Sequence, residues 1–363
     1  MKKRAVSVLL ACTMVLAMMG CSSNTPETTA STDAPKETTE ATESANKETT
    51  EAAGEDVTEA VSEAASAADG DIMIGISMCA IESQMWAEYQ TAMHEKCDEL
   101  GVKYTEVIAE NDVQKQNQQI ENLISSGADA IIIAPADGEA VVSAIKKCNE
   151  AGVPVIMANR AAGEGAEVAG TVTSDNVAMV EREMNYVLDK AKKEGKTYKV
   201  VKLVGSLTDV NAVARDTGFK NVADANTDVF DVVSEVPTEW KGELALAGIL
   251  SAFEANPDIN MIFSPSDALL PSIISGLQQI DKWYPIGDEK HVTIVTFDGA
   301  KDAVDQIKAN YVDIVSVQDA TTQGQLCVEG AVAAAKGEKT EGLVDPGFEV
   351  TPENVEELGF AGY

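Results

Sequence analysis

The sequence has few of the groups on which common catalytic sites depend. Only two of its 363 residues are histidines, His94 and His291, and neither accompanies a G-x-S-x-G nucleophile motif. No G-x-x-x-x-G-K-[ST] segment and no strand-linked G-x-G-x-x-G segment is present. These absences disfavour enzymes that use histidine or a bound nucleotide, so an enzyme would depend on carboxylates alone.

Cysteine and positive charge are also scarce. The six cysteines form no C-x-x-C pair and no Cys/His cluster at metal spacing, so we expect no metal and no cofactor. Cys79, Cys97, Cys148 and Cys327 are expected to be small buried residues, and a disulfide between Cys97 and Cys327 stays open. The net charge of -33 disfavours nucleic acid and anionic surfaces as partners.

The N-terminus has the pattern of an export signal. Lys2, Lys3 and Arg4 precede an apolar run, Val6 to Gly20, that is shorter than the roughly 20 residues of a membrane span. The run ends at Cys21 and resembles the lipobox of bacterial lipoproteins, in which the cysteine is acylated. The resemblance implies a signal peptide over residues 1–21 and a lipid anchor on Cys21; a plain secretory signal is the alternative.

Residues 22–70 consist mainly of Thr, Glu, Ala and Ser and contain no aromatic residue. Such a segment cannot bury enough apolar surface to offset its conformational entropy. We therefore predict a disordered acidic tether that holds a folded domain away from a membrane. The alternative, a partner-binding acidic segment, has no anchor residues to support it.

The rest of the chain alternates between predicted strands and helices. Such alternation is typical of parallel, doubly wound sheets, and the strands are too many for one sheet, so we predict an α/β fold with two Rossmann-like lobes. The predicted strands cover Ile72 to Ile76, Asp129 to Ile133, Val153 to Met157, Lys199 to Val204, Val229 to Val236, Met261 to Phe263, Val292 to Phe297 and Ile314 to Val317.

Polar residues follow the ends of these strands, where open α/β sheets bind their ligands. They are Ser77, Asn159, Arg160, Ser266, Asp298 and Gln318, and Arg215 lies near the start of the helix after Val204. In this order and spacing, the chain from about Asp71 onward resembles the ribose/galactose-type periplasmic binding proteins of ABC importers.

The resemblance implies a type I periplasmic binding protein fold with a three-segment hinge near 174–175, 318–319 and 345–346. The first lobe would comprise 71–174 plus 319–345, and the second 175–318 plus 346–363. A sugar site would include the seven polar residues above, together with Met85, Trp86 and Trp240, which take the places of the aromatic residues that sandwich the sugar ring. Asn159 and Ser266 depart from the ribose-binding pattern, so the identity of the sugar stays open.

These observations predict a lipid-anchored, extracellular, monomeric solute-binding protein that delivers a monosaccharide to an ABC permease. The alternatives are a sensor component for a sugar, cyclitol or furanose-like signal, and a glycosidase that uses Asp298 with Asp267. The glycosidase is disfavoured because Arg160 and Arg215 would keep both carboxylates ionised and leave no general acid.

Overall fold

The computed structural model describes residues 72–340 and 342–363. The predicted signal peptide, Cys21 and the acidic tether lie outside these residues. Within the described ranges, no helix combines the length and the hydropathy that crossing a membrane would require.

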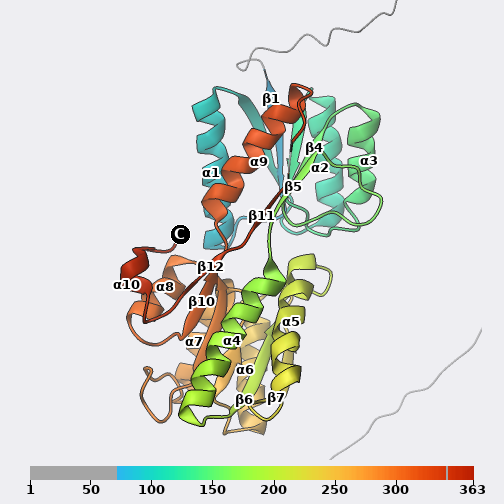
Figure 1. Cartoon of the computed structure of the whole chain (residues 1–363). Helices are drawn as coiled ribbons and strands as arrows, with labels where there is room; N and C mark the ends of the chain where they lie inside the picture. The colour runs from blue at the N-terminus through green and yellow to red at the C-terminus, as the bar shows by residue number, and fades with distance from the viewer. Residues whose placement is uncertain (1–71, 341) are drawn as a thin grey trace, which may run out of the picture. The chain divides into compact units, whose positions relative to one another are not determined.

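The described residues form two α/β lobes, each built on a six-stranded sheet (Figure 1). The first sheet has the order β11-β5-β4-β3-β1-β2, and every neighbouring pair is parallel. Its strands are β1 (Met73–Met78), β2 (Lys103–Ile108), β3 (Ala130–Ile133), β4 (Val155–Asn159), β5 (Gly170–Ser174) and β11 (Leu343–Asp345).

The second sheet has the order β12-β10-β9-β8-β6-β7. Only β12 runs antiparallel to its neighbour, β10. The strands are β6 (Tyr198–Val204), β7 (Phe230–Pro237), β8 (Met261–Phe263), β9 (Thr293–Asp298), β10 (Ile314–Val317) and β12 (Phe348–Val350).

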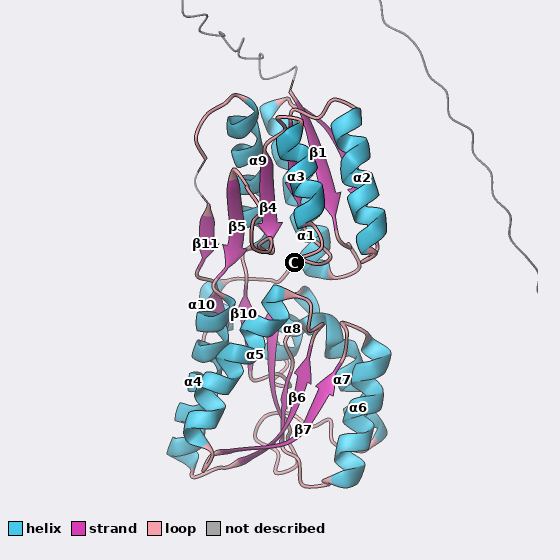
Figure 2. Ribbon diagram, turned by 90° about the vertical axis from the view of Figure 1, so that its right-hand side faces the viewer, coloured by secondary structure: helices cyan, strands magenta, loops and turns pink. Residues whose placement is uncertain are grey.

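Helices cover both faces of each sheet (Figure 2). In the first lobe α1 (Gln84–Leu100) packs against α9 (Ala320–Ala335), and α2 (Val113–Ser125) packs against α3 (Val142–Glu150). In the second lobe α4 (Asn176–Glu194) pairs with α5 (Val210–Ala223), and α6 (Gly242–Ala255) pairs with α7 (Leu270–Gln279). Two further helices, α8 (Lys301–Lys308) and α10 (Val355–Leu358), complete the second lobe.

The chain crosses between the two sheets three times (Figure 1). The crossings run from β5 to α4, from β10 to α9 and from β11 to β12. Each lobe is thus assembled from segments that are far apart in the sequence.

Local sequence explains most of these elements. The run Ile131 to Ile133 is completely buried, as expected for a strand that is covered on both faces. Asp175 caps α4, where its side chain accepts a hydrogen bond from the Ala178 backbone N–H (3.1 Å). The sequence reading missed β2, which alternates exposed and half-buried residues at the edge of its sheet, and the short β5, β11 and β12.

The four cysteines of the described residues are buried and free. The open question of a disulfide is thereby answered for Cys97 and Cys327, which are not joined. The Cys327 thiol instead lies 3.2 Å from the Tyr89 hydroxyl. Burial raises the pKa of both thiols to about 12, so neither is a reactive thiolate.

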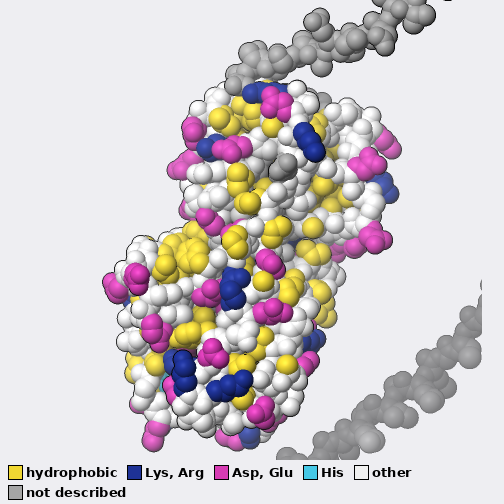
Figure 3. Space-filling model, viewed as in Figure 1, with side chains coloured by type: hydrophobic (Ala, Val, Ile, Leu, Met, Phe, Trp, Pro, Cys, Tyr) yellow, Lys and Arg dark blue, Asp and Glu magenta, His cyan; other side chains and the backbone are white. Residues whose placement is uncertain are grey.

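Acidic side chains are scattered over the surface of both lobes on the face seen in Figure 3. They are interspersed with lysine, arginine and apolar side chains and do not gather at one place. The acidic side chains on this face therefore form no single charged patch.

Candidate ligand-binding cleft

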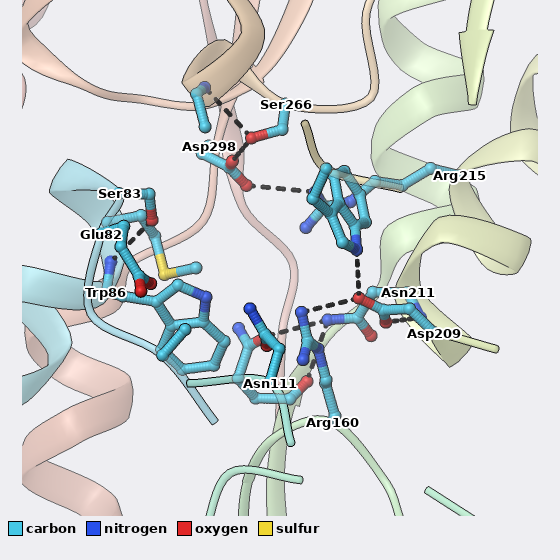
Figure 4. Close-up of a pocket in the computed structure, with 15 residues that line it drawn as sticks. Glu82, Ser83, Trp86, Asn111, Arg160, Asp209, Asn211, Arg215, Ser266 and Asp298 are labelled. Atoms are coloured by element: carbon cyan, nitrogen blue, oxygen red, sulfur yellow. Dashed lines mark hydrogen bonds and ion pairs between the residues drawn. The ribbon is translucent and has the colours of Figure 1, made fainter. Parts of the chain in front are cut away.

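A cavity of about 220 Å³ opens where the carboxyl ends of the strands of one sheet face those of the other. Both lobes contribute to its wall, as Figure 4 shows. The lining residues are Ala80, Glu82, Ser83, Met85, Trp86, Asn111, Asn159, Arg160, Asp209, Asn211, Arg215, Trp240, Ser266, Ala268 and Asp298.

The first lobe contributes Trp86, which the N-terminal turn of α1 holds in place. Ser83 caps this helix, and its hydroxyl accepts a hydrogen bond from the Trp86 backbone N–H (3.2 Å). Arg160 follows β4, and its guanidinium lies over the Trp86 ring, 5.3 Å from the centroid. The same guanidinium donates to the Pro135 carbonyl (3.0 Å), which fixes its position at the cleft.

The second lobe contributes Trp240, from the turn between β7 and α6. Its indole N–H donates to the Asp209 carboxylate (3.1 Å). The ring also packs closely against Gly205, which directly follows β6. A Cβ atom at residue 205 would come within 2.3 Å of the indole. The glycine at this position therefore allows Trp240 to occupy its place in the cleft.

Arg215 and Asp298 form a buried ion pair at the cleft wall, and each is only 3% exposed. Arg215 Nη1 lies 3.1 Å from Asp298 Oδ1 and also donates to the Pro265 carbonyl (2.7 Å). Its guanidinium stacks 3.8 Å from the centroid of the Phe297 ring. Gln318 donates to the same carboxylate oxygen, Asp298 Oδ1 (2.7 Å). This network holds Arg215 in a single orientation.

Asp267 lies behind Asp298 and does not line the cavity. Its Oδ2 accepts hydrogen bonds from the backbone N–H groups of Gly299 (2.9 Å) and Ala300 (2.6 Å). Burial raises the pKa of Asp267 well above its usual value, and the neighbouring charge of Asp298 raises it further. Burial also raises the pKa of Asp298, although Arg215, Ser266 and Gln318 oppose the shift.

The direction of these shifts runs against the expectation that the arginines keep the pKa of both carboxyl groups low. Desolvation outweighs the attraction of Arg215 at both groups, and the upward shift is stronger at Asp267. Of the two carboxyl groups proposed for a glycosidase, only Asp298 lines the cavity. The two groups therefore do not flank one ligand position as an acid and base pair would.

Direct contacts join the lobes across the cleft. Arg160 Nη2 of the first lobe lies 2.6 Å from Asp209 Oδ2 of the second lobe. Asn211 of the second lobe donates to Asn159 Oδ1 of the first lobe (2.8 Å). Asn159 has a positive φ of 63° at the end of β4, and its amide donates to Gln318 at the second crossing (2.9 Å). The contacts thus link the cleft wall to the second crossing between the lobes.

The structure brings eight of the ten predicted site residues together in the cavity wall. Ser77 and Gln318 are buried and do not line it. Ser77 accepts a hydrogen bond from Gln116 (3.2 Å), and Gln318 lies behind Asn159 and Asp298. The lining residues are Met85, Trp86, Asn159, Arg160, Arg215, Trp240, Ser266 and Asp298.

The sequence did not predict five polar lining residues, which are Glu82, Ser83, Asn111, Asp209 and Asn211. Asn111 follows β2, a strand that was not predicted. Asp209 caps α5, so the pattern Asp-x-Asn directly before a predicted helix was a signal that could have drawn attention to it. That Asp209 faces Arg160 depends on how the lobes pack.

Comparisons with known proteins agree with this architecture. The family described as periplasmic binding protein domain matches residues 74–339. The ribose import binding protein of Bacillus subtilis is 29% identical over 271 residues, which is 75% of this chain and 84% of that protein. The ribose import binding protein of Haemophilus influenzae is 29% identical over 292 residues, 80% of this chain and 94% of that protein.

Among solved structures, an ABC transporter solute-binding protein of Bacillus halodurans with bound myo-inositol is 27% identical. The similarity covers 80% of this chain and 98% of that one, with a TM-score of 0.73. The two-lobed α/β fold, with its three crossings, is the type I fold of such proteins. The chain therefore belongs to the periplasmic binding protein domain family, among the sugar-binding solute-binding proteins of ABC transporters.

Proposed function

We propose that this protein is a lipid-anchored extracellular solute-binding protein that captures one neutral monosaccharide or cyclitol in the cleft and delivers it to an ABC permease. The ribose import binding proteins and the myo-inositol-bound structure that it resembles support this class of ligand. The anchor would be the lipid on Cys21, and the protein would act as a monomer without a cofactor. The proposal is for a carrier and not for an enzyme.

The observation that carries the proposal is the combination of flat apolar surface with hydrogen-bonding groups in one small cavity. Trp86 and Trp240 approach it from opposite lobes, and the rest of its wall is mainly amide, carboxylate and guanidinium groups. A sugar has an apolar C–H face and a belt of hydroxyl groups, which such a wall matches. Binding pockets commonly span roughly 300–1,000 Å³, so the cavity of about 220 Å³ suits a very small ligand.

We propose that capture involves hinge closure. The bodies would be 71–174 plus 319–345 and 175–318 plus 346–363, rotating about the three crossings. The ligand must bind the closed arrangement more tightly than the open one, or closure cannot report its presence to the permease. Contacts such as Arg160 with Asp209 exist only when the lobes meet, so they belong to the closed side of this equilibrium.

Isothermal titration calorimetry against neutral aldopentoses, aldohexoses and myo-inositol tests the proposal. We expect one-site binding to at least one member of the panel. The absence of binding heat for every member would refute the proposal. Arg215→Lys should lower the affinity at least about tenfold, because lysine keeps the charge beside Asp298 but lacks the planar fork of donors. Arg182→Lys, at the ion pair with Glu349, is the matched control.

The anchor requires a separate test. Mass spectrometry of the membrane fraction should find an acylated Cys21 as the mature N-terminus. Cys21→Ser should release the protein from the membrane and leave its affinity for the sugar unchanged. An unmodified, soluble N-terminus in the wild-type protein would refute the anchor without touching the binding proposal.

A further inference from the structure

Both arginines of the cleft are already paired with a carboxylate. Arg215 is paired with Asp298 within the second lobe. Arg160 is paired with Asp209 from the opposite lobe, and their side chains are 11% and 3% exposed. Neither guanidinium therefore presents an uncompensated positive charge to a ligand.

Asp209 is held in place by three interactions. Its Oδ1 accepts a hydrogen bond from the backbone N–H of Asn211 (2.9 Å) as the cap of α5. Its Oδ2 accepts the Trp240 indole N–H (3.1 Å) and lies 2.6 Å from Arg160 Nη2. Figure 4 shows Asp209, Asn211 and Arg160 close together at the cavity wall. The carboxylate cannot turn away from Arg160 without breaking its other hydrogen bonds.

Arg160 is equally constrained. Its Nη1 donates to the Pro135 carbonyl (3.0 Å) and to the Cys79 sulfur (3.4 Å), and its guanidinium lies over the Trp86 ring. Its Nη2 pairs with Asp209 of the second lobe, and its Nε is buried and has no hydrogen-bond partner among the described residues. A carboxylate on a ligand would have to compete with Asp209 for Nη2.

The formal charge of the wall reinforces this competition. Its charged residues are Arg160 and Arg215 against Glu82, Asp209 and Asp298, a balance of two positive groups and three negative groups. An anionic ligand would lose its hydration in the cleft and meet no free cation in return, which is costly. An uncharged polyol has no such penalty and can bond to the outer lone pairs and N–H groups of the paired side chains.

We propose that Asp209 determines the charge selectivity of the cleft. By pairing with Arg160 across the two lobes it excludes sugar acids and leaves a site for uncharged polyols. Removal of its charge frees Arg160 and converts the cleft to one that accepts a carboxylate. This inference rests on the proposed function, since it concerns the same cleft.

The test compares wild-type protein with Asp209→Asn. Asparagine has nearly the same shape and is also a preferred helix cap, so α5 keeps its N-terminal hydrogen bond. Calorimetry measures the dissociation constants for the neutral panel and for D-glucuronate and D-galacturonate. For each sugar we take the ratio of the dissociation constant of the uronate to the dissociation constant of the matching neutral aldose. We expect this ratio to fall at least about tenfold in the variant. Asp209→Ser, another capping residue, should behave in the same way and serves if the first variant fails to fold.

Asp258→Asn is the control, because it removes the same charge from the same lobe. Asp258 pairs with Lys199 near the amino end of β6, whereas the cleft lies at the carboxyl ends of the strands. Its substitution should therefore leave the ratio unchanged. A wild-type protein that binds no neutral member of the panel would overturn the proposed function. A wild-type protein that binds one, with Asp209 variants whose ratio stays within threefold of wild type, would overturn only this inference. Tighter binding of a uronate than of its aldose by the wild type would also overturn it.

Discussion

Gly205→Ala should abolish most ligand binding although residue 205 does not line the cleft. The new Cβ atom would lie 2.3 Å from the Trp240 ring, whereas ordinary contact begins near 3.4 Å, so the ring must move by about 1.1 Å. Gly205 does not have a left-handed φ, so alanine adds no backbone strain there. The main effect of the substitution is therefore a displacement of the Trp240 ring.

A displacement of this size has two effects on the site. The indole loses the good geometry of its hydrogen bond to Asp209, which is 3.1 Å long, and no longer covers one face of the ligand. Covering a ring face with an aromatic side chain contributes about 2 kcal/mol. That loss corresponds to a dissociation constant about 30-fold higher.

Calorimetry with the best ligand of the panel measures this effect, and a thermal melt of each protein shows whether the fold is retained. Gly330→Ala is the matched control. Its Cβ would meet only Ile156, at an ordinary distance of 3.4 Å, so affinity should be unchanged. Binding by Gly205→Ala within threefold of wild type would show that Trp240 does not form a wall of the site, and the reasoning would fail.

Three further predictions follow from buried groups. Asn211→Ala removes the hydrogen bond to Asn159 across the lobes, so we expect about tenfold weaker binding by calorimetry, as for the loss of one hydrogen bond; an unchanged affinity would contradict this. Burial raises the pKa of Glu183 well above its usual value. The folded protein therefore keeps a proton that the unfolded chain releases above about pH 4.3. The free energy of unfolding consequently falls as the pH rises from that value toward the raised pKa. Glu183→Gln should therefore raise the Tm by a few degrees at pH 8 and by less at pH 5, and an equal gain at both would refute the assignment. Because Cys97 and Cys327 are free, adding a reductant should leave the Tm unchanged, and both thiols should react with iodoacetamide once the protein is unfolded without reductant.

Arg215 illustrates why the depth of a residue matters for such tests. The sequence places it near a helix start and, through the family resemblance, in the sugar site, where alanine would be expected to abolish binding without harming the fold. In the structure it is buried against Phe297 and Asp298, so Arg215→Ala would leave a buried carboxylate unpaired. A loss of binding in that variant would be confounded with a loss of stability, which is why lysine is the better substitution.

Most cleft residues that could be predicted from the sequence are those that directly follow or end a predicted strand. Asn159 and Asp298 directly end apolar, buried runs, and parallel strands place such ends at one edge of a sheet. Ser77 also ends such a run but points to Gln116 under the sheet. Successive residues of a strand face opposite sides, and the apolar run alone does not reveal which side a helix covers.

The sequence by itself determined the α/β alternation, because apolar runs and helix caps act through neighbours along the chain. It also determined most of the residues at the strand ends and, through its resemblance to known proteins, the family. Only the tertiary structure decided that Asp209 neutralises Arg160, that Asn211 meets Asn159 and that Gly205 makes room for Trp240. These pairs join segments separated by tens of residues, and they depend on how two lobes with three crossings are packed, which no local pattern in the sequence records.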